Sequence, residues 1–309
     1  MSRIKTHSSL PMVSVIIPTH NRYPLVCRAI KSVLMQSYEN IECLVIDDAS
    51  TDETVPQLRK KYLNKIVLLQ NETNKEKSYT RNKGVYSSSG EFVCFLDSDD
   101  TLTIDSIKSR VECFTNDPLF DGVSFGLRRR AGKKSPSINS SEMVPSNTKL
   151  SLDEYLKNRS WLSNNSFLLR KDKMTELGMY NVDLSVRGDQ ELLIRLLSVL
   201  EFRFCGSVVT EIFEDATLRA RTSFEKIIKQ RDLFTATLEG NPIVYQKLGP
   251  WLQKLKIHER SEVLRSLYQS RKYKDYREEY LSLIKQRVAP LNMRFLKRYL
   301  LSFIRKGIP

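Results

Sequence analysis

The stretch "FVCFLDSDDTL", residues 92–102, carries an apolar run directly into a cluster of carboxylates. Five apolar residues precede Asp97, and Asp99 and Asp100 follow it closely. A short apolar run bounded by polar residues is typical of a buried strand that ends at the edge of a sheet. Carboxylates this close together repel one another and resist losing water. The pattern therefore predicts a strand whose carboxyl end meets something cationic.

Three earlier segments have the same character: "VSVIIP" (13–18), "IECLVIDD" (41–48) and "KIVLLQN" (65–71). Residues with helical spacing of apolar side chains lie between them. Strands that alternate with helices predict an α/β fold, a mostly parallel sheet flanked by helices on both faces. In such sheets ligands bind beyond the carboxyl ends of the strands. The polar residues that end three of these strands should therefore converge on one crevice.

The rest of the chain divides by charge. Residues 128–149 are polar and predict a surface loop, and further strands and helices follow up to about residue 209. From about residue 223 the pattern is helical to the end. Residues 216–309 hold 21 Lys and Arg against 8 Asp and Glu, a net charge of +13 out of +14 for the chain. We therefore expect two parts, an α/β domain at 1–215 and a basic helical region at 216–309.

The cysteines and the hydropathy of the chain indicate the cellular compartment of the protein. The five cysteines are scattered without a C-x-x-C pair, which favours reduced thiols over a disulfide or zinc framework. No apolar run approaches the roughly 18 residues that span a bilayer, and the first residues lack the apolar core of a signal peptide. We expect a cytoplasmic protein, or one attached peripherally to the inner face of the membrane.

Four motifs, "VSVIIPTHNR", "LVIDDASTDET", "TRNKG" and "GEFVCFLDSDD", occur in this order. Together they resemble the family 2 glycosyltransferases with the GT-A (Rossmann-like) fold, over about residues 12–215. The resemblance implies sugar transfer from a nucleotide-diphosphate donor to an acceptor hydroxyl, with inversion at the anomeric carbon and a divalent metal. It also implies a glycan or lipid-linked glycan as the acceptor.

Asp97 and Asp99 match the D-x-D motif of that family. Hard cations such as Mn²⁺ or Mg²⁺ prefer carboxylate, water and phosphate oxygens, so an ion here would keep positions open for the diphosphate. We expect Asp99 to be the direct ligand and Asp97 to face the ribose or the metal's water shell, with Ser98 beside the nucleotide. Capping of a following helix is the alternative for Asp100.

Asp48 matches a family position that accepts a hydrogen bond from the nucleobase imide. A carboxylate there suits uracil, so UDP is favoured, although dTDP would fit nearly as well; helix capping is the alternative, and it suits Asp47 better. Arg81 is placed to meet the base or the diphosphate, and a solvated helix charge is its alternative. The residues expected to line the base pocket are Pro18, Thr19, His20 and Asn21.

Asp189 is the candidate general base, because the acceptor hydroxyl must lose its proton as the new bond forms. It also opens an amphipathic helical stretch, so capping is its structural alternative. Gly188 stands where the family usually has Glu, which implies that the donor sugar is held differently here.

Trp161 and Asn164, with Asn165 beside them, lie where the resemblance places the acceptor cleft, although a core tryptophan is as consistent with the pattern. After the last strand the family offers a histidine to the metal, and this chain has none in "VVTEIFEDATLRARTS". Arg219 and Arg221 are candidates to bind the diphosphate instead.

Three other functions compete with sugar transfer. A nucleotidyltransferase would present a glycine-rich loop after its first strand, whereas "PTHNRYP" has no glycine. A dehydrogenase is disfavoured because no G-x-G-x-x-G follows a strand. A basic nucleic-acid-binding protein would leave the acidic strand ends unexplained, since charge alone supports only nonspecific attraction. We expect no nucleic-acid partner.

The last helix, predicted at 292–306, places an apolar side among basic residues. That arrangement suits the surface of an anionic membrane, which would bring the enzyme to a lipid-linked acceptor. Packing on the catalytic domain or on a second copy, in a homodimer through the C-terminal helices, is the alternative. The apolar side consists of Phe295, Leu296, Tyr299, Leu300, Phe303 and Ile304.

Overall fold

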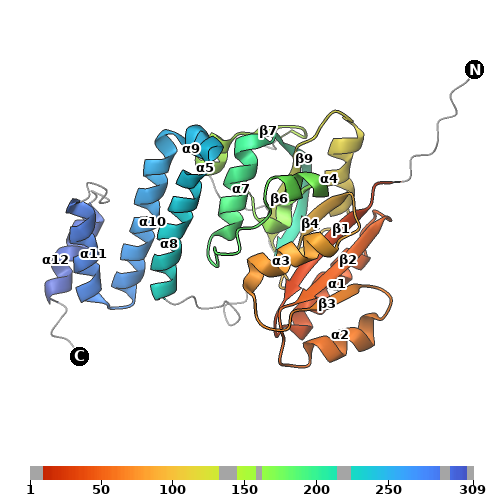
Figure 1. The fold of residues 1–309 in the computed structure, drawn as a ribbon, viewed down its shortest axis with the longest axis horizontal. Helices are drawn as coiled ribbons and strands as arrows, with labels where there is room; N and C mark the ends of the chain where they lie inside the picture. Colours follow the sequence, from red (N-terminus) through yellow and green to blue (C-terminus); the bar gives the residue numbers. More distant parts are fainter. Residues whose placement is uncertain (1–9, 132–144, 158–161, 214–223, 286–292, 305–309) are drawn as a thin grey trace, which may run out of the picture. The chain divides into compact units, whose positions relative to one another are not determined.

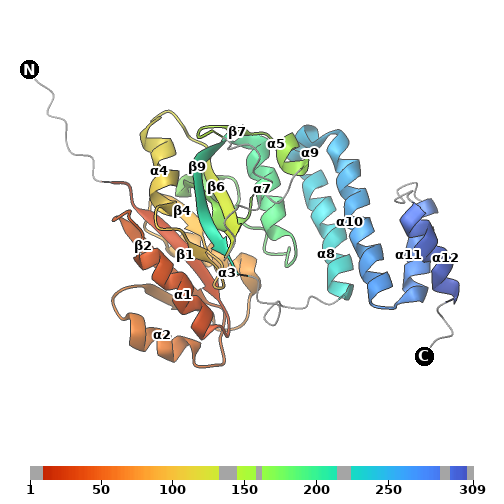
Figure 2. The same ribbon diagram turned by 180° about the vertical axis from the view of Figure 1, so that it is seen from behind.

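The computed structural model describes residues 10–131, 145–157, 162–213, 224–285 and 293–304. The chain forms two compact units, Met1–Thr217 and Leu218–Pro309. In the described residues the first unit combines a sheet with helices, and the second is helical (Figures 1 and 2). The division falls close to the change in charge at residue 216.

The first unit follows the alternation of strands and helices that the sequence predicts. Its strands are β1 (Val13–Thr19), β2 (Ile41–Asp47), β3 (Val67–Gln70), β4 (Phe92–Phe95), β5 (Thr101–Leu102), β6 (Val123–Arg130), β7 (Lys149–Leu150), β8 (Phe167–Arg170) and β9 (Phe202–Ile212). Its helices are α1 (Tyr23–Leu34), α2 (Thr54–Tyr62), α3 (Glu76–Ser87), α4 (Ser106–Thr115), α5 (Leu152–Lys157), α6 (Lys171–Glu176) and α7 (Gly188–Val199), with a 3₁₀ turn, η1, at Asn164–Ser166.

All nine strands belong to one mixed sheet, in the order β3-β2-β1-β4-β8-β6-β9-β5, with β7 paired to β9. The pairs among β3, β2, β1 and β4 are parallel. Strand β8 then runs antiparallel to both β4 and β6. The parallel half is the part that carries the acidic strand ends, so those ends lie along one edge.

Strands β1 and β4 are buried along their whole length and β2 over its last five residues, as their unbroken apolar runs predict, whereas β3 at the edge of the sheet is more exposed. Val15 of β1 packs in a cluster with Ile30 of α1 and Val111 of α4. The neighbouring Ile16 points to the other face, where α3 crosses the sheet at Gly84. A Cβ at Gly84 would lie 2.4 Å from Ile16 Cγ2, so only glycine allows this close approach. Figures 1 and 2 show α3 and α1 on opposite faces.

One prediction about this unit is wrong at its boundaries. The polar segment 128–149 was expected to be a loop throughout, yet β6 continues to Arg130 and β7 begins at Lys149. The register of β6 against β9 is irregular between Phe125 and Arg128. Long arginine side chains can extend an exposed strand end because their stems pack on the sheet while their charges reach water.

The second unit contains α8 (Phe224–Gly240), α9 (Pro242–Leu248), α10 (Pro250–Gln269), α11 (Tyr273–Lys285) and α12 (Met293–Ile304). Its core includes Leu264 of α10, Tyr276 and Tyr280 of α11, and Phe295 of α12. The hydroxyl of Tyr276 donates to the Phe295 carbonyl across 2.9 Å. None of the helices in the described residues combines the length and hydropathy needed to cross a membrane.

The apolar side predicted for the last helix divides into an inner and an outer part. Phe295 is buried and Tyr299 packs against Tyr280, with 5.2 Å between the ring centroids. Leu296, Leu300 and Phe303 are exposed by 40%, 57% and 54%. The helix therefore uses one apolar stripe for the core and keeps a second one on its surface.

Candidate active site

The candidate site lies at the carboxyl edge of the parallel strands. Thr19, the last residue of β1, is in register with Asp47, the last of β2. The amide of Asp48 donates to the Thr19 carbonyl across 2.8 Å, and Asp97 follows β4, which pairs with β1. Parallel pairing thus gathers three sequence motifs that the resemblance assigned to the nucleotide.

Each acid of the D-x-D motif is paired with an arginine. Arg81 Nη2 lies 2.6 Å from Asp97 Oδ1, and Arg22 Nη1 lies 2.9 Å from Asp99 Oδ2. Burial opposes the charge on Asp97, but Arg81, Lys77 and Arg22 outweigh it and hold the pKa of that carboxyl below its usual range. Asp97 is therefore a carboxylate and can act as a metal ligand. Arg81 is buried, so it is not a solvated helix charge.

Asp100 does not cap a helix. Strand β5 follows it directly, and α4 begins only at Ser106 with Asp105 before it. The Asp100 carboxyl is buried and accepts hydrogen bonds from Asn165 Nδ2 at 2.5 Å and from the Phe213 amide at 3.2 Å. Burial, and after it the charge of Asp97, raise the pKa of Asp100 to about 7. The third acid of the motif therefore faces inward.

The residues expected around the base are fixed by hydrogen bonds within the loops that follow the strands. Asp48 Oδ1 accepts from Asn71 Nδ2 and from the Lys75 amide, both at 2.8 Å, so a base imide would have to reach the other oxygen. His20 Nδ1 lies 2.8 Å from the Asp48 carbonyl oxygen, which fixes the ring beside this carboxylate. Asp47 instead holds the next turn by accepting from the Ser50 amide at 2.9 Å.

The remaining predicted pocket residues differ in what they contact. Pro18 is buried within β1, paired to Ile46, and Ser98 is buried in the acidic turn. Thr19 Oγ1 is buried and makes no hydrogen bond to the rest of the described chain. Asn21 is exposed with a positive φ of 50°, and its Oδ1 accepts from the Thr51 amide at 2.8 Å. Asn21 thus ties the loops after β1 and β2 together.

Asp189 stands in the first turn of α7, after Arg187 with a left-handed φ of 67°. Its Oδ1 accepts from the amide of Gln190 at 2.9 Å, a contact within its own turn. The charge of Asp189 acts on the pKa of Arg81 and of Arg128, so the folded chain brings it into the field of the acidic edge. The candidate base therefore lies within electrostatic reach of Arg81, which pairs with Asp97.

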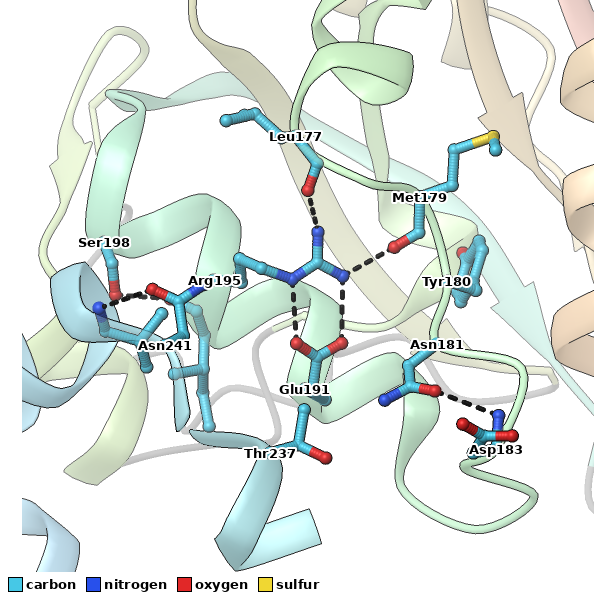
Figure 3. A network of polar contacts seen from close by, with 12 residues as sticks. Leu177, Met179, Tyr180, Asn181, Asp183, Glu191, Arg195, Ser198, Thr237 and Asn241 are labelled. Atoms are coloured by element: carbon cyan, nitrogen blue, oxygen red, sulfur yellow. Dashed lines mark hydrogen bonds and ion pairs between the residues drawn. The ribbon is translucent and has the colours of Figure 1, made fainter. Parts of the chain in front are cut away.

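Hydrogen bonds from Arg195 hold the helix that carries Asp189. Arg195 donates through Nε to Glu191 Oε1 at 2.8 Å and through Nη2 to Glu191 Oε2 at 2.9 Å (Figure 3). Arg195 Nη2 also donates to the Met179 carbonyl at 2.5 Å. The bidentate pair orients Arg195, whose bonds to the carbonyls of Leu177 and Met179 hold the segment before α7 against the helix. The next residue in that segment is Tyr180, whose ring lies 5.3 Å from the Arg81 guanidinium.

Gly188 has a packing reason to lack a side chain. A Cβ at this position would lie 2.9 Å from Ser78 Oγ, which itself donates to the Leu184 carbonyl at 3.1 Å. The first turn of α7 therefore lies against α3, and a side chain at position 188 would displace the Ser78 hydroxyl.

Sequence reasoning missed Arg128, which it placed in a loop. The charges of Asp100, Asp189 and Asp97 all act on Arg128, while burial lowers its pKa. Continued strand spacing through "VSFGLRRR" was the signal that could have found it. Arg128 adds a cation among the site's acids.

Among the acceptor candidates, Trp161 lies outside the described residues, as do the diphosphate candidates Arg219 and Arg221. Asn164 is buried, and its Oδ1 accepts from the Tyr180 hydroxyl at 2.9 Å. Asn165 is 2% exposed. Both asparagines therefore make internal contacts in this structure.

The carboxylates of Asp97 and Asp99 suit a divalent ion whose remaining coordination positions are filled by a bound ligand. Within the described residues no three His, Cys, Asp or Glu gather as a metal site. Asp97 and Asp99 keep side-chain exposures of 31% and 35% and offer two carboxylates at one edge. Mg²⁺ and Mn²⁺ sites of enzymes that act on phosphates commonly combine one or two carboxylates with water and phosphate oxygens. These residues are compatible with such an ion.

Acids and arginines thus gather at one edge of an α/β sheet. The sequence pattern of the family described as Glycosyl transferase family 2 matches residues 14–178, more than half of the chain. The chain belongs to glycosyl transferase family 2.

Two relatives show how far the sequence similarity extends. The chain is 42% identical over 96 residues to a Campylobacter jejuni GalNAc(5)-diNAcBac-PP-undecaprenol beta-1,3-glucosyltransferase, covering 30% of this chain and 31% of that protein. It is 30% identical over 115 residues to the Escherichia coli UDP-Glc:alpha-D-GlcNAc-diphosphoundecaprenol beta-1,3-glucosyltransferase WfaP, covering 37% and 46%. The matches thus span less than half of either relative.

A solved structure supports the fold. S. aureus TarS 1-349 in complex with UDP aligns with a TM-score of 0.66 at 17% identity, covering 96% of this chain and 92% of that one. The GT-A fold that the sequence predicts, followed by C-terminal helices, is confirmed.

Proposed function

We propose that this chain is an inverting, metal-dependent glycosyltransferase that moves a sugar from a UDP-sugar to a hydroxyl of a lipid-linked glycan. The observation that carries the proposal is the arrangement along one sheet edge. Asp48 follows β2, Asp97 and Asp99 follow β4, and the charge of Asp189 reaches the same edge. We assign Asp48 to the base and Asp97 and Asp99 to the diphosphate. The relatives above act on diphosphoundecaprenol-linked sugars, which supports the acceptor class.

The chain's own residues suit the steps of a direct displacement. Asp189 takes the proton of the acceptor hydroxyl as its oxygen bonds to the anomeric carbon, and the bond from that carbon to the diphosphate oxygen breaks. Arg81 and Arg22, which pair with Asp97 and Asp99, would neutralise part of the charge on the departing diphosphate. A divalent ion held by Asp97 and Asp99 supplies Lewis-acid stabilisation of the same leaving group.

Asp48 is the basis for preferring a uracil base. A carboxylate accepts from the imide N–H of uracil or thymine, and Asn71 and Lys75 already occupy one of its oxygens. Calorimetric titration with UDP, dTDP, GDP and CDP, each with and without Mn²⁺, tests this preference. We expect the tightest Mn²⁺-dependent binding for UDP. Tighter binding of GDP or CDP would contradict the assignment of Asp48.

We also propose peripheral attachment to the inner face of an anionic membrane through residues 216–309. The exposed stripe of Leu296, Leu300 and Phe303 supports it, together with the net charge of +13 in this region. A homodimer through the same helices is the competing outcome.

Screening a panel of nucleotide sugars for metal-dependent hydrolysis would identify the donor. Release of UDP from one UDP-sugar, abolished by a chelator, is the expected result. Equal hydrolysis in the presence of chelator would contradict the metal-dependent mechanism.

A further inference from the structure

One buried side chain joins three segments at the proposed diphosphate position. Asn165 Oδ1 accepts from the Asp97 amide at 2.9 Å, and its Nδ2 donates to Asp100 Oδ2 at 2.5 Å. Its own carbonyl accepts from the Thr210 hydroxyl of β9 at 2.7 Å. Asn165 thereby ties the ends of β4 and β9 to the 3₁₀ turn that carries it.

Asp100 extends this connection to the end of β9. Its second oxygen, Oδ1, accepts from the Phe213 amide at 3.2 Å, the first residue after that strand. The guanidinium of Arg28 stacks 3.6 Å from the Phe213 ring centroid and donates to the Asp99 carbonyl at 2.5 Å. The backbone at Asp97 and Asp99 is therefore fixed from two sides.

These contacts involve the backbone of the D-x-D acids, whose side chains remain partly exposed. Asn165 and Asp100 are only 2% and 6% exposed, whereas the Asp97 and Asp99 side chains keep about a third of their surface. The asparagine and the inner acid therefore hold the backbone of this turn, and the outer acids face the ligand.

We propose that Asn165 and Asp100 are positioning residues that set the direction of the Asp97 and Asp99 carboxylates toward the donor's diphosphate and its cation. The inference rests on the proposed function. Misplacing a catalytic contact by about an ångström can cost two orders of magnitude in rate, so a rigid support at this turn matters.

The pair allows a test by exchange. Asp100→Asn brings two side-chain amide groups together. In every orientation of these amides, one side-chain N–H group faces another donor. That donor is Asn165 Nδ2, the Phe213 amide or the Asp97 amide. Asn165→Asp sets two carboxyl groups against each other. The double variant Asp100→Asn with Asn165→Asp restores all three hydrogen bonds, with donor and acceptor exchanged only in the bond between residues 100 and 165. It keeps acceptors for the Asp97 and Phe213 amides.

The measurement is Mn²⁺-dependent affinity for UDP by calorimetry. Opposed buried donors in Asp100→Asn and opposed carboxyl groups in Asn165→Asp should each weaken this affinity by about tenfold or more, with the exchanged variant within about threefold of wild type. Gln36→Glu is the matched control, because the Gln36 amide also bridges buried backbone groups, at Thr103 and Ile107. It should lower the melting temperature without changing the Mn²⁺ dependence.

The outcomes separate the two proposals. Single variants that bind as wild type does, or an exchanged variant as weak as the singles although folded, would overturn the positioning role alone. Absence of UDP binding to the wild type would refute the proposed function, and the positioning with it. If a single variant does not fold, the exchanged variant still decides, since only restored hydrogen bonding predicts wild-type affinity.

Discussion

Arg22 and Asp99 form an ion pair across 77 positions of the chain, with 2.9 Å between Nη1 and Oδ2. Each residue follows the carboxyl end of a parallel strand, β1 for the arginine and β4 for the acid. In this state the arginine compensates the charge that we assign to metal binding. A cation arriving with the diphosphate would release Arg22 to contact phosphate oxygens, which are the partners its planar fork suits.

Asp99→Asn should remove the Mn²⁺ dependence of donor binding and weaken that binding strongly. The substitution keeps the size of the side chain but removes the charge that a hard cation prefers. Calorimetry with UDP and Mn²⁺ is the measurement. Asp117→Asn is the control, because Asp117 pairs with Arg203 at 2.6 Å outside the D-x-D turn. Unchanged metal-dependent affinity in Asp99→Asn would leave Asp99 with a structural role only.

Asp189→Asn should lower turnover by roughly 10²–10⁴-fold, the range of general acid–base catalysis. UDP affinity should stay near normal, because the Asp189 carboxylate accepts from its own turn at Gln190. Steady-state kinetics on the identified donor and acceptor, paired with calorimetry, separate these effects. Wild-type turnover in this variant would exclude Asp189 as the base.

Gly188→Ala should destabilise the fold by on the order of 1 kcal/mol, because its Cβ would meet Ser78 Oγ at 2.9 Å. The cost should be smaller in a Ser78→Ala background, where that oxygen is absent. Urea unfolding of the two single variants and the double variant measures the coupling. An equal cost in both backgrounds would show that this contact does not exclude a side chain at 188.

Leu300→Asp should reduce sedimentation of the protein with anionic vesicles, because Leu300 is the most exposed of the three apolar residues on the outer stripe of α12. Binding should fall with salt and after truncation beyond about residue 285, since each cation contributes about 1 kcal/mol near such a surface. Leu119→Asp is the control, an exposed leucine of the first unit.

One result would contradict membrane attachment. Equal recovery in the supernatant with anionic and neutral vesicles would assign the stripe to an intramolecular contact or a second copy. Analytical ultracentrifugation of Leu300→Asp would then distinguish these, because loss of a dimer would identify the second copy.

The sequence alone determined the parallel strands and the acids that end them. Val15, Ile16 and Ile17 read as a strand because burial on both faces requires an unbroken apolar run, and that pattern is local. Motif order placed Asp48 and Asp97 at one edge, since parallel strands end on the same side. The pairing of Arg81 with Asp97, in contrast, depends on how α3 crosses the sheet.

Only the tertiary structure decided which polar residues support those acids. Asn165 and Asp100 are 65 positions apart, and no local pattern predicts that their side chains meet. The sequence predicted that a loop begins at Arg128. The continuation of β6 through this residue depends on pairing with β9, more than seventy residues later in the chain, which no local pattern reports. Periodicity reports which face of an element is buried, whereas hydrogen bonds between distant segments depend on the register that folding sets.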